Sequence, residues 1–280
     1  MRHPHYTDAL SDLKHQTLNS TIDFVEIHAE NFFAKGGISK TLLRDVSEKY
    51  SVSVHGTSLG LGSELEVPAN ILAQFAEVVE TSQAILVSEH LCFNRAKVGD
   101  TVLHSGDLLP LAYNQASLDL LSRNIDQVQS RLQRPILIEN LSAYITASEL
   151  QDTALDDRSE IDFLIDLCKH AGCGLLLDLN NLIVNAINQK QGDIVNTIVQ
   201  RVQRLPPAIV GEIHLAGFSP KQVQGFVVDD HACAVSEQCW ELYRNVINIF
   251  GHKPTLIEWD NNLPEWSVLQ AEAERARSYC

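Results

Sequence analysis

The sequence lacks the segments that export a protein or anchor it in a membrane. Its first residues, Met1 to Asp8, are polar and lead into no apolar stretch, whereas a secretory signal needs an apolar segment behind a basic start. Nowhere do about 18 apolar residues follow one another, the length at which a transmembrane helix becomes a candidate. We therefore expect a cytoplasmic protein that has no membrane partner.

Basic residues are also scarce. The chain has 21 Lys and Arg against 36 Asp and Glu, and its formal net charge is −15. A protein this acidic repels a phosphate backbone and attracts cations or basic peptides. We therefore expect no nucleic-acid partner.

The motifs of several common enzyme classes are missing as well. No GxGxxG, Walker loop, GxSxG elbow or HExxH segment occurs, and these are the usual markers of nucleotide-binding, hydrolase and zinc-protease chemistry. The six cysteines form no CxxC pair. Without an export signal, we expect them to be reduced thiols packed into the structure.

The sequence does have a regular alternation of β-rich runs and helical stretches. With 45% hydrophobic and 20% charged residues, we interpret residues 1–280 as one globular domain. Seven runs have the composition of strands: Asp23–His28, Ser51–His55, Ala84–His90, Pro135–Glu139, Gly174–Asp178, Ile209–His214 and Thr255–Glu258. This alternation predicts a parallel sheet, and the expected fold is an α/β barrel of the (β/α)8 TIM type.

The first strand of that barrel is predicted to be trimmed. The first helix-like stretch, Tyr6 to Leu18, starts almost at the N-terminus. Only Met1 to His3 would then remain of the strand. Another chain can cover such a weakly closed edge, so a homodimer is a hypothesis.

Every predicted strand ends in residues that can bind a metal. They are Glu26 and His28, His55, Glu89 and His90, Glu139 and Asn140, Asp178 with Asn180 and Asn181, His214, and Glu258 with Asp260. The C-terminal ends of parallel barrel strands meet at one mouth, so we expect these side chains to lie together. A single His at a strand end is more often a hydrogen-bonded core residue. Several carboxylates buried together, however, need cations or protons to neutralise them.

The mixed imidazole and carboxylate set points to Fe, Mn, Co or Zn. Glu139 is the candidate for a carboxylate that bridges two metals about 3.5–4 Å apart, so a cluster is favoured over a single ion. Glu212 shares a strand face with His214. We prefer His214 as the ligand because it lies nearer the end of the strand. We expect Glu212 to support the ligand or pack in the core and not to bind the metal.

Two loops provide further candidates. Asp229, Asp230 and His231 offer carboxylates and an imidazole close together, or form a surface turn. The segment from His104 to Asp107 either covers the mouth as a lid that contacts substrate or starts the helix near Pro110.

Nearly the whole chain resembles the multinuclear non-haem iron-dependent oxidases, a family that includes the oxidase of methanobactin biosynthesis. The resemblance is carried by FVEIHAENFF at 24–33, SVHG at 53–56, LVSEHL at 86–91, DLLPLAY at 107–113, LIEN at 137–140, GLLLDLNN at 174–181, GEIHLAG at 211–217 and LIEWDNNLP at 256–264. It implies a xylose-isomerase-like barrel with two or three iron ions, or Mn or Zn in their place. These ions would activate O2 and oxidise a cysteine or another residue of a ribosomally made precursor peptide, with a peptide-recognition protein as a further partner.

The resemblance also implies a role for individual residues. By motif, the ligands are His55, His90 and Glu139 for the first iron, Glu139 as the bridge with Asp178, His214 and Glu258 for the second, and Asn181, Asp229 and His231 for the third. Asp260 is the candidate for moving protons, with His28 as the alternative.

Two positions near the expected third metal depart from the family pattern. Gln189 follows Asn188 where the family has a His, and Phe218 replaces a His that commonly follows the HLAG motif. Two other interpretations stay open. One is a divalent-metal isomerase or hydrolase built on the same barrel, and the other is a protein that binds metal or a partner without catalysis.

Overall fold

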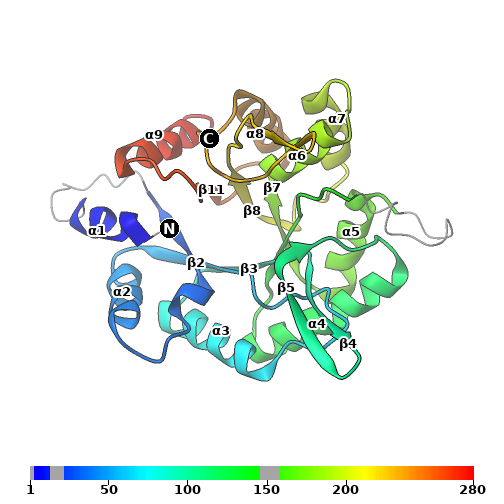
Figure 1. The fold of residues 1–280 in the computed structure, drawn as a ribbon. Helices are drawn as coiled ribbons and strands as arrows, with labels where there is room; N and C mark the ends of the chain where they lie inside the picture. Colours follow the sequence, from blue (N-terminus) through cyan, green and yellow to red (C-terminus); the bar gives the residue numbers. More distant parts are fainter. Residues whose placement is uncertain (1–2, 13–21, 146–157) are drawn as a thin grey trace.

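The computed structural model describes residues 3–12, 22–145 and 158–280. Seven parallel strands form one curved sheet in the order β1-β2-β3-β6-β7-β8-β11, and helices surround it (Figure 1). The strands are β1 (Phe24–His28), β2 (Ser51–Gly56), β3 (Leu86–His90), β6 (Leu137–Glu139), β7 (Gly174–Asp178), β8 (Val210–Leu215) and β11 (Thr255–Ile257). Each coincides with one of the predicted β-rich runs, so the predicted barrel architecture is confirmed.

The helices pack on the outer face of this sheet. They are α1 (His3–Asp12), the short 3-10 helix η1 (Ala29–Phe32), α2 (Ile38–Ser47), α3 (Ala69–Ser82), α4 (Gln115–Leu132), α5 (Glu160–Ala171), α6 (Leu179–Asn188), α7 (Ile194–Val202), α8 (Glu237–Phe250) and α9 (Trp266–Arg277). Outward-facing strand residues such as Ile27, Val54 and Leu177 are buried against them. Ser159 and Ser236 cap α5 and α8 because their side chains accept hydrogen bonds from backbone N–H groups of the first turn.

The barrel wall stays open between β1 and β11. No strand pairs with the outer edge of either one among the described residues, and a cavity of about 660 Å³ lies between them, lined by residues that include Phe24, Leu256 and Trp266. The prediction that Met1 to His3 is a strand remnant is wrong for His3, which begins α1. Met1 and Arg2 lie outside the described residues, as do the last residues of the helix predicted over Tyr6 to Leu18.

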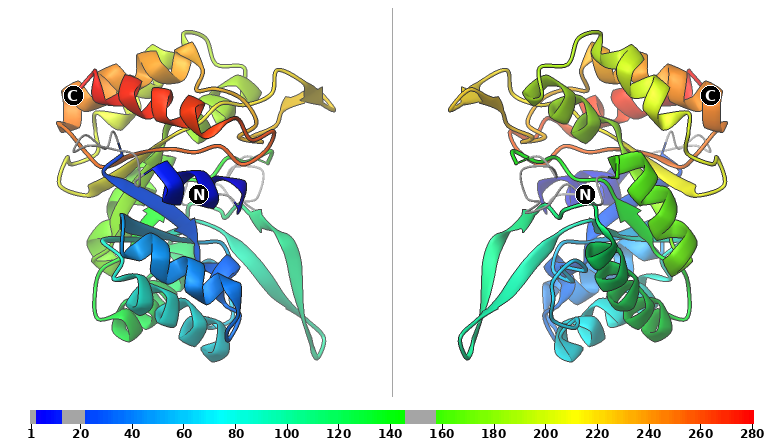
Figure 2. Two further views of the ribbon diagram at one scale, coloured as in Figure 1. Left: turned by 90° about the vertical axis from the view of Figure 1, so that its left-hand side faces the viewer. Right: turned by 90° about the vertical axis from the view of Figure 1, so that its right-hand side faces the viewer.

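Two hairpins project from the end of the barrel where the strands finish (Figure 2). The longer one consists of β4 (Phe93–Val98) and β5 (Thr101–Leu109), and the shorter one of β9 (Gln222–Val223) and β10 (Phe226–Val227). The segment His104 to Asp107 therefore belongs to a strand. The alternative that it starts a helix is wrong, because α4 begins only at Gln115, where Asn114 caps it.

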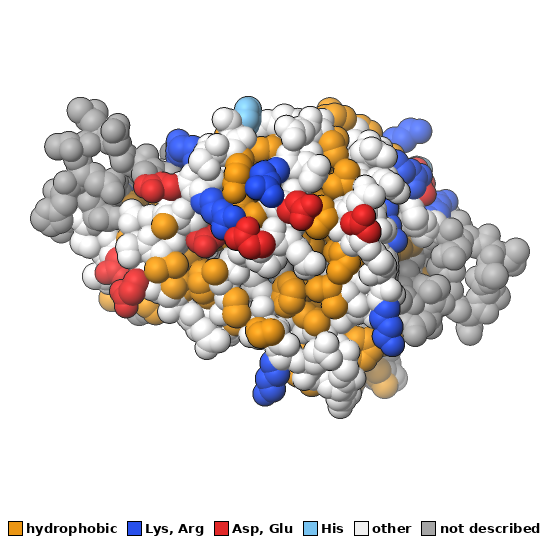
Figure 3. Space-filling model, turned by 90° about the horizontal axis from the view of Figure 1, so that it is seen from above, with side chains coloured by type: hydrophobic (Ala, Val, Ile, Leu, Met, Phe, Trp, Pro, Cys, Tyr) orange, Lys and Arg blue, Asp and Glu red, His pale blue; other side chains and the backbone are white. Residues whose placement is uncertain are grey.

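The outer surface over the last helices is mixed in charge. Acidic and basic side chains lie beside one another between apolar patches on the face seen in Figure 3, and Arg275 of α9 pairs with Glu237 of α8 at 2.9 Å. All six cysteines are free thiols. Within the described ranges, no helix is both long enough and apolar enough to span a membrane.

Candidate metal centre

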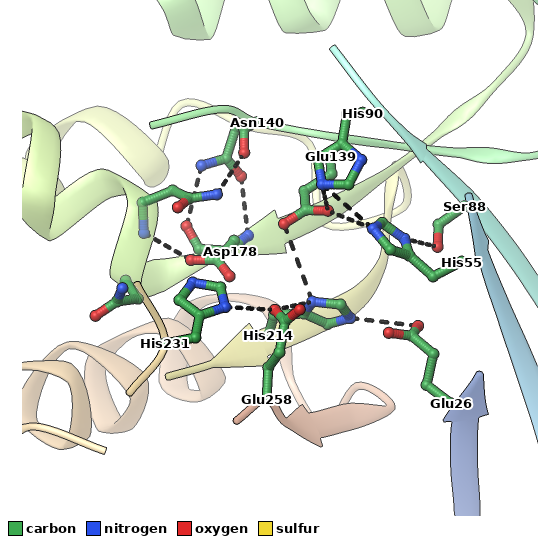
Figure 4. A network of polar contacts seen from close by, with 12 residues as sticks. Glu26, His55, Ser88, His90, Glu139, Asn140, Asp178, His214, His231 and Glu258 are labelled. Atoms are coloured by element: carbon green, nitrogen blue, oxygen red, sulfur yellow. Dashed lines mark hydrogen bonds and ion pairs between the residues drawn. The ribbon is translucent and has the colours of Figure 1, made fainter. Parts of the chain in front are cut away.

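The ends of neighbouring strands bring a first group of three buried side chains together. His55 of β2, His90 of β3 and Glu139 of β6 offer ligand atoms that all lie within 4.8 Å of one another. Glu139 Oε2 is 3.2 Å from Nε2 of each histidine. Both ring nitrogens and the carboxylate oxygen therefore face one small volume (Figure 4).

A second group of four shares Glu139 with the first. Glu139, Asp178, His214 and Glu258 also have ligand atoms within 4.8 Å of one another, and all are buried or nearly so. His214 Nδ1 lies 3.2 Å from Glu258 Oε2 and 4.0 Å from Glu139 Oε1. Since Oε2 of Glu139 faces the first group and Oε1 faces the second, this carboxylate has the geometry of a bridge between two ions.

Hydrogen bonds behind the histidines determine which nitrogen faces the centre. Ser88 Oγ lies 2.7 Å from His55 Nδ1, and the carbonyl oxygen of Gly56 accepts from His90 Nδ1 at 3.0 Å. On the far side of His214, Nε2 lies 3.5 Å from Glu26. Partners of this kind orient metal-binding imidazoles and select their tautomer, so Nε2 of His55 and His90 and Nδ1 of His214 are left to face the centre.

Asn140 connects the second group to the start of α6. Its side chain accepts from the backbone N–H of Asp178 at 2.9 Å and donates to the Asp178 carbonyl at 3.0 Å. Asp178 caps α6, because its Oδ1 accepts from the Asn181 N–H at 2.6 Å. Asn181 Nδ2 in turn donates to the carbonyl of Asn140 at 2.9 Å. Both Asp178 and Asn181 are thus held with one side-chain oxygen still available.

Several of these donor atoms have no hydrogen bond although they are buried. They include Glu139 Oε2, Asp178 Oδ2 and Asn181 Oδ1. A buried carboxylate or amide oxygen without a partner is destabilising, and bound cations remove that penalty. The residues present therefore fit metal ions, and oxygen and imidazole donors suit iron, manganese or zinc.

The charges around the centre shift the pKa values of its members. Burial raises the pKa of Glu139 to about 8, although His90 and His214 oppose the shift. Burial and the negative charge of Asp229 raise the pKa of Asp178 to about 7. Burial alone would lower the pKa of His90, but Glu139 and Glu89 outweigh it and raise the pKa to about 9. Without cations, protons neutralise the cluster in part.

Asp229 and His231 reach the centre from the loop between β10 and α8. His231 Nδ1 lies 3.2 Å from Glu258 Oε2, and its Nε2 lies 2.8 Å from Asp229 Oδ1. Asp229 also accepts hydrogen bonds from Asn180 at 2.7 Å and Ser142 at 3.0 Å. These two residues are near the second group, but their polar atoms already contact one another. Asp230 lines the same cavity but belongs to none of these groups, and it accepts from the backbone N–H of Ser219 at 2.8 Å.

The remaining predicted residues surround this core. Glu212 is fully buried behind His214, and its ligand atoms lie within 4.8 Å of those of Glu26 and His214. His28, Glu258 and Asp260 form a further group within 4.8 Å at the mouth. Ser88 was not among the predicted residues, although it lies on the same inward face of β3 as His90, two residues away.

Comparison with known proteins identifies the family. The family model described as "RiPP precursor modification enzyme MbnB/TglH/ChrH" matches residues 1–280. A "UPF0276 protein" of Chromobacterium violaceum is 40% identical over 278 residues, which cover 99% of this chain and 92% of that protein. The chain belongs to this family. Another member, UPF0276 protein RB0508 of Rhizobium meliloti, is 36% identical over 285 residues, covering 98% of this chain and 87% of that protein.

Solved structures of the same fold are more distant in sequence. A D-psicose 3-epimerase from Clostridium cellulolyticum superimposes with a TM-score of 0.58 at 10% identity, covering 100% of this chain and 93% of that one. Endonuclease IV from Thermus thermophilus gives a TM-score of 0.58 at 13% identity, with coverage of 98% and 93%. A protein with a xylose isomerase domain from Salmonella typhimurium also gives 0.58, at 13% identity and coverage of 91% and 86%. These likenesses confirm the expected xylose-isomerase-like barrel.

Proposed function

We propose that this protein is a multinuclear non-haem iron oxidase that uses O2 to oxidise a cysteine or another residue of a ribosomally synthesised precursor peptide. One observation carries the proposal: two groups of buried imidazole and carboxylate donors share a single carboxylate, Glu139. Membership of a family of precursor-modifying enzymes supports a peptide substrate. The imidazole and carboxylate donors suit iron.

The chain's residues would divide among the ions as follows. His55, His90 and Glu139 would hold one ion, and Glu139 with Asp178, His214 and Glu258 a second. The family resemblance would assign a third ion to Asn181, Asp229 and His231, of which Asp229 and His231 lie 2.8 Å apart. When bound, iron ions would supply electrons to O2 and a Lewis-acidic site that binds a substrate thiolate. Glu139 would set the separation of the first two ions, because each of its oxygens faces one group.

The substrate would enter through the mouth of the barrel. A cavity of about 540 Å³ there is lined by residues that include Glu139, Glu258, Asp260 and the apolar side chains of Leu109 and Leu141. Apolar walls exclude water from reactive species. Asp260 is the candidate for moving protons, because its carboxylate belongs to the group that it forms with His28 and Glu258 at the entrance.

The test begins with protein purified without oxygen and loaded with ⁵⁷Fe(II). We expect about two or more ions per chain and, after exposure to O2, a Mössbauer spectrum of antiferromagnetically coupled iron. The cysteine-containing peptide encoded nearest to its gene should then consume O2 and change mass. Tight retention of redox-silent zinc or manganese without a coupled iron pair would favour the isomerase or hydrolase. A coupled pair that consumes no O2 with that peptide would favour metal binding without catalysis.

A further inference from the structure

The β4–β5 hairpin exposes more apolar surface than a free-standing ribbon normally does. Val98, Val102 and Leu103 are 60%, 54% and 51% exposed, and no third strand joins the pair among the described residues. Ala96 lies opposite Leu103 and Val98 opposite Thr101, so Ala96, Val98 and Leu103 share one face of the ribbon. Two strands alone are marginally stable in water, so this two-stranded ribbon would be stabilised by a further strand added at its edge.

The turn of the hairpin shows which backbone groups of β5 are available. Gly99, with φ +60°, is the first of two turn residues between Val98 and Thr101, as in the type II′ turns that favour glycine there. In such a hairpin the two residues that flank the turn, here Val98 and Thr101, exchange backbone hydrogen bonds, and the next pair of opposed residues does not. The backbone N–H and C=O groups of Val102 and His104 therefore point away from β4.

The same strand leads from this edge into the mouth of the barrel. The pairing of β4 with β5 shifts register between Phe93 and Arg95. On β5, Gly106 has φ +75°, and Ser105 Oγ donates to the carbonyl of Asp107 at 2.6 Å. Beyond this bend, Asp107, Leu108 and Leu109 line the cavity that also contains Glu139 and Glu258. The course of β5 thus connects its outer part to the cavity that contains Glu139 and Glu258.

We propose that the precursor peptide binds as an added strand on the free edge of β5, at Val102 and His104. This inference rests on the proposed function, since a family that modifies precursor peptides favours a peptide over other occupants. Main-chain hydrogen bonds would supply affinity, and apolar side chains of the peptide would pack beside Val102 and Leu103 of β5. From Val102 to Asp107 a strand advances about 17 Å, so the modified residue would lie about five residues from the paired segment.

The test uses metal-free protein and a fluorescein-labelled peptide made of three Thr-Val repeats, a Gly-Ser-Gly-Ser spacer and a cysteine. We expect saturable binding by fluorescence anisotropy and slower amide exchange at Val102 and His104. Leu103→Asp should raise the Kd at least tenfold. The matched control Val223→Asp, at a residue of the other hairpin with a similar exposure of 52%, should change it less than twofold. A peptide with N-methylated valines should bind at least tenfold more weakly.

The binding assay would overturn the inference if no saturable binding appears up to millimolar peptide. Equal binding of the N-methylated peptide, or equal effects of the two Asp variants, would overturn it as well. A dimer that Leu103→Asp converts to monomer, with the peptide Kd unchanged, would assign the surface to a second copy instead. The binding assay needs neither iron nor O2, so a failed oxidation assay leaves its result intact. Conversely, peptide oxidation that Leu103→Asp does not alter would reject the docking site and leave the oxidase standing.

Discussion

The two sides of the metal centre are held in different ways. On one side, His55 and His90 stand on adjacent strands and are oriented from behind by Ser88 and the Gly56 carbonyl. On the other side, Asp229 and His231 come from a loop, and the His231 backbone has φ +43°, a conformation uncommon outside glycine. Strands hold ligands more rigidly than loops do.

The difference extends to the donor atoms themselves. Glu139 Oε2 lies 3.2 Å from Nε2 of His55 and of His90 but accepts no hydrogen bond, so these strand residues are preorganised for a cation. Both oxygens of Asp229 already accept hydrogen bonds, from Asn180 and Ser142. We therefore expect two tightly bound ions on the strand side and a third that binds more weakly, because it must displace existing contacts.

The largest expected effect follows from removing the shared carboxylate. Glu139→Ala should abolish the coupled iron pair and peptide oxidation together, because it removes a ligand from both strong sites at once. Removing a residue that only supports a metal ligand weakens metal binding about 10–100-fold. We expect Glu139→Ala to weaken metal binding more than that. Metal analysis and Mössbauer spectroscopy provide the measurement. Glu237→Ala, at an exposed residue of α8, is the control, and a coupled pair retained in Glu139→Ala would reject the bridging assignment.

A smaller effect should come from removing the hydrogen-bond partner of His55. Ser88→Ala removes the partner of His55 Nδ1 and leaves the ring free to turn, so the Kd for Zn²⁺ should rise about 10–100-fold while the fold is unchanged. Competition with a chromophoric chelator measures it. Ser82→Ala is the matched control, because this buried serine donates only to carbonyls of its own helix, those of Val78 and Val79. Equal affinities for the two variants would show that Ser88 does not orient the imidazole.

The contrast between strands and loops also explains what could be predicted from sequence. The seven sheet strands were predictable because their outward faces are apolar and their ends carry His, Asp or Glu. The β4–β5 hairpin was not, since nearly all of β5 is exposed and its residues show no alternation of apolar and polar character. A strand without a buried face leaves no such signal.

The candidate site divides in the same way. His55, His90, Glu139, Asp178, His214 and Glu258 follow from one rule, that parallel strands converge at their C-terminal ends. The Gly56 carbonyl that orients His90 cannot be inferred from residue types, because every residue has a carbonyl. Nor does the sequence reveal that Asp229 is already engaged by Asn180 and Ser142, since those contacts depend on the path of a loop.

Protons should compete with cations on the strand side. Glu139, Asp178 and His90 have pKa values raised to about 8, 7 and 9, so the metal-free cluster holds protons that must leave when a cation binds. As pH rises from 6 to 8 this competition weakens, and the Kd for Zn²⁺ should fall at least about tenfold per pH unit. Glu139→Gln should give a shallower dependence. A Kd independent of pH would contradict the assigned protonation.

The smallest effect on the two strongly bound ions should come from the loop that carries Asp229 and His231. Asp229→Asn keeps an oxygen for hydrogen bonding but removes a negative charge, so the weak third ion should be lost while the Kd of the two strong ions changes less than about twofold. Counting ions per chain against free metal concentration measures both at once, and Asp178→Asn is the matched control that should weaken the pair. If Asp229→Asn weakens the pair as much as Asp178→Asn does, loop and strands form one site, and rigidity of the strands is not what makes the first two ions tight.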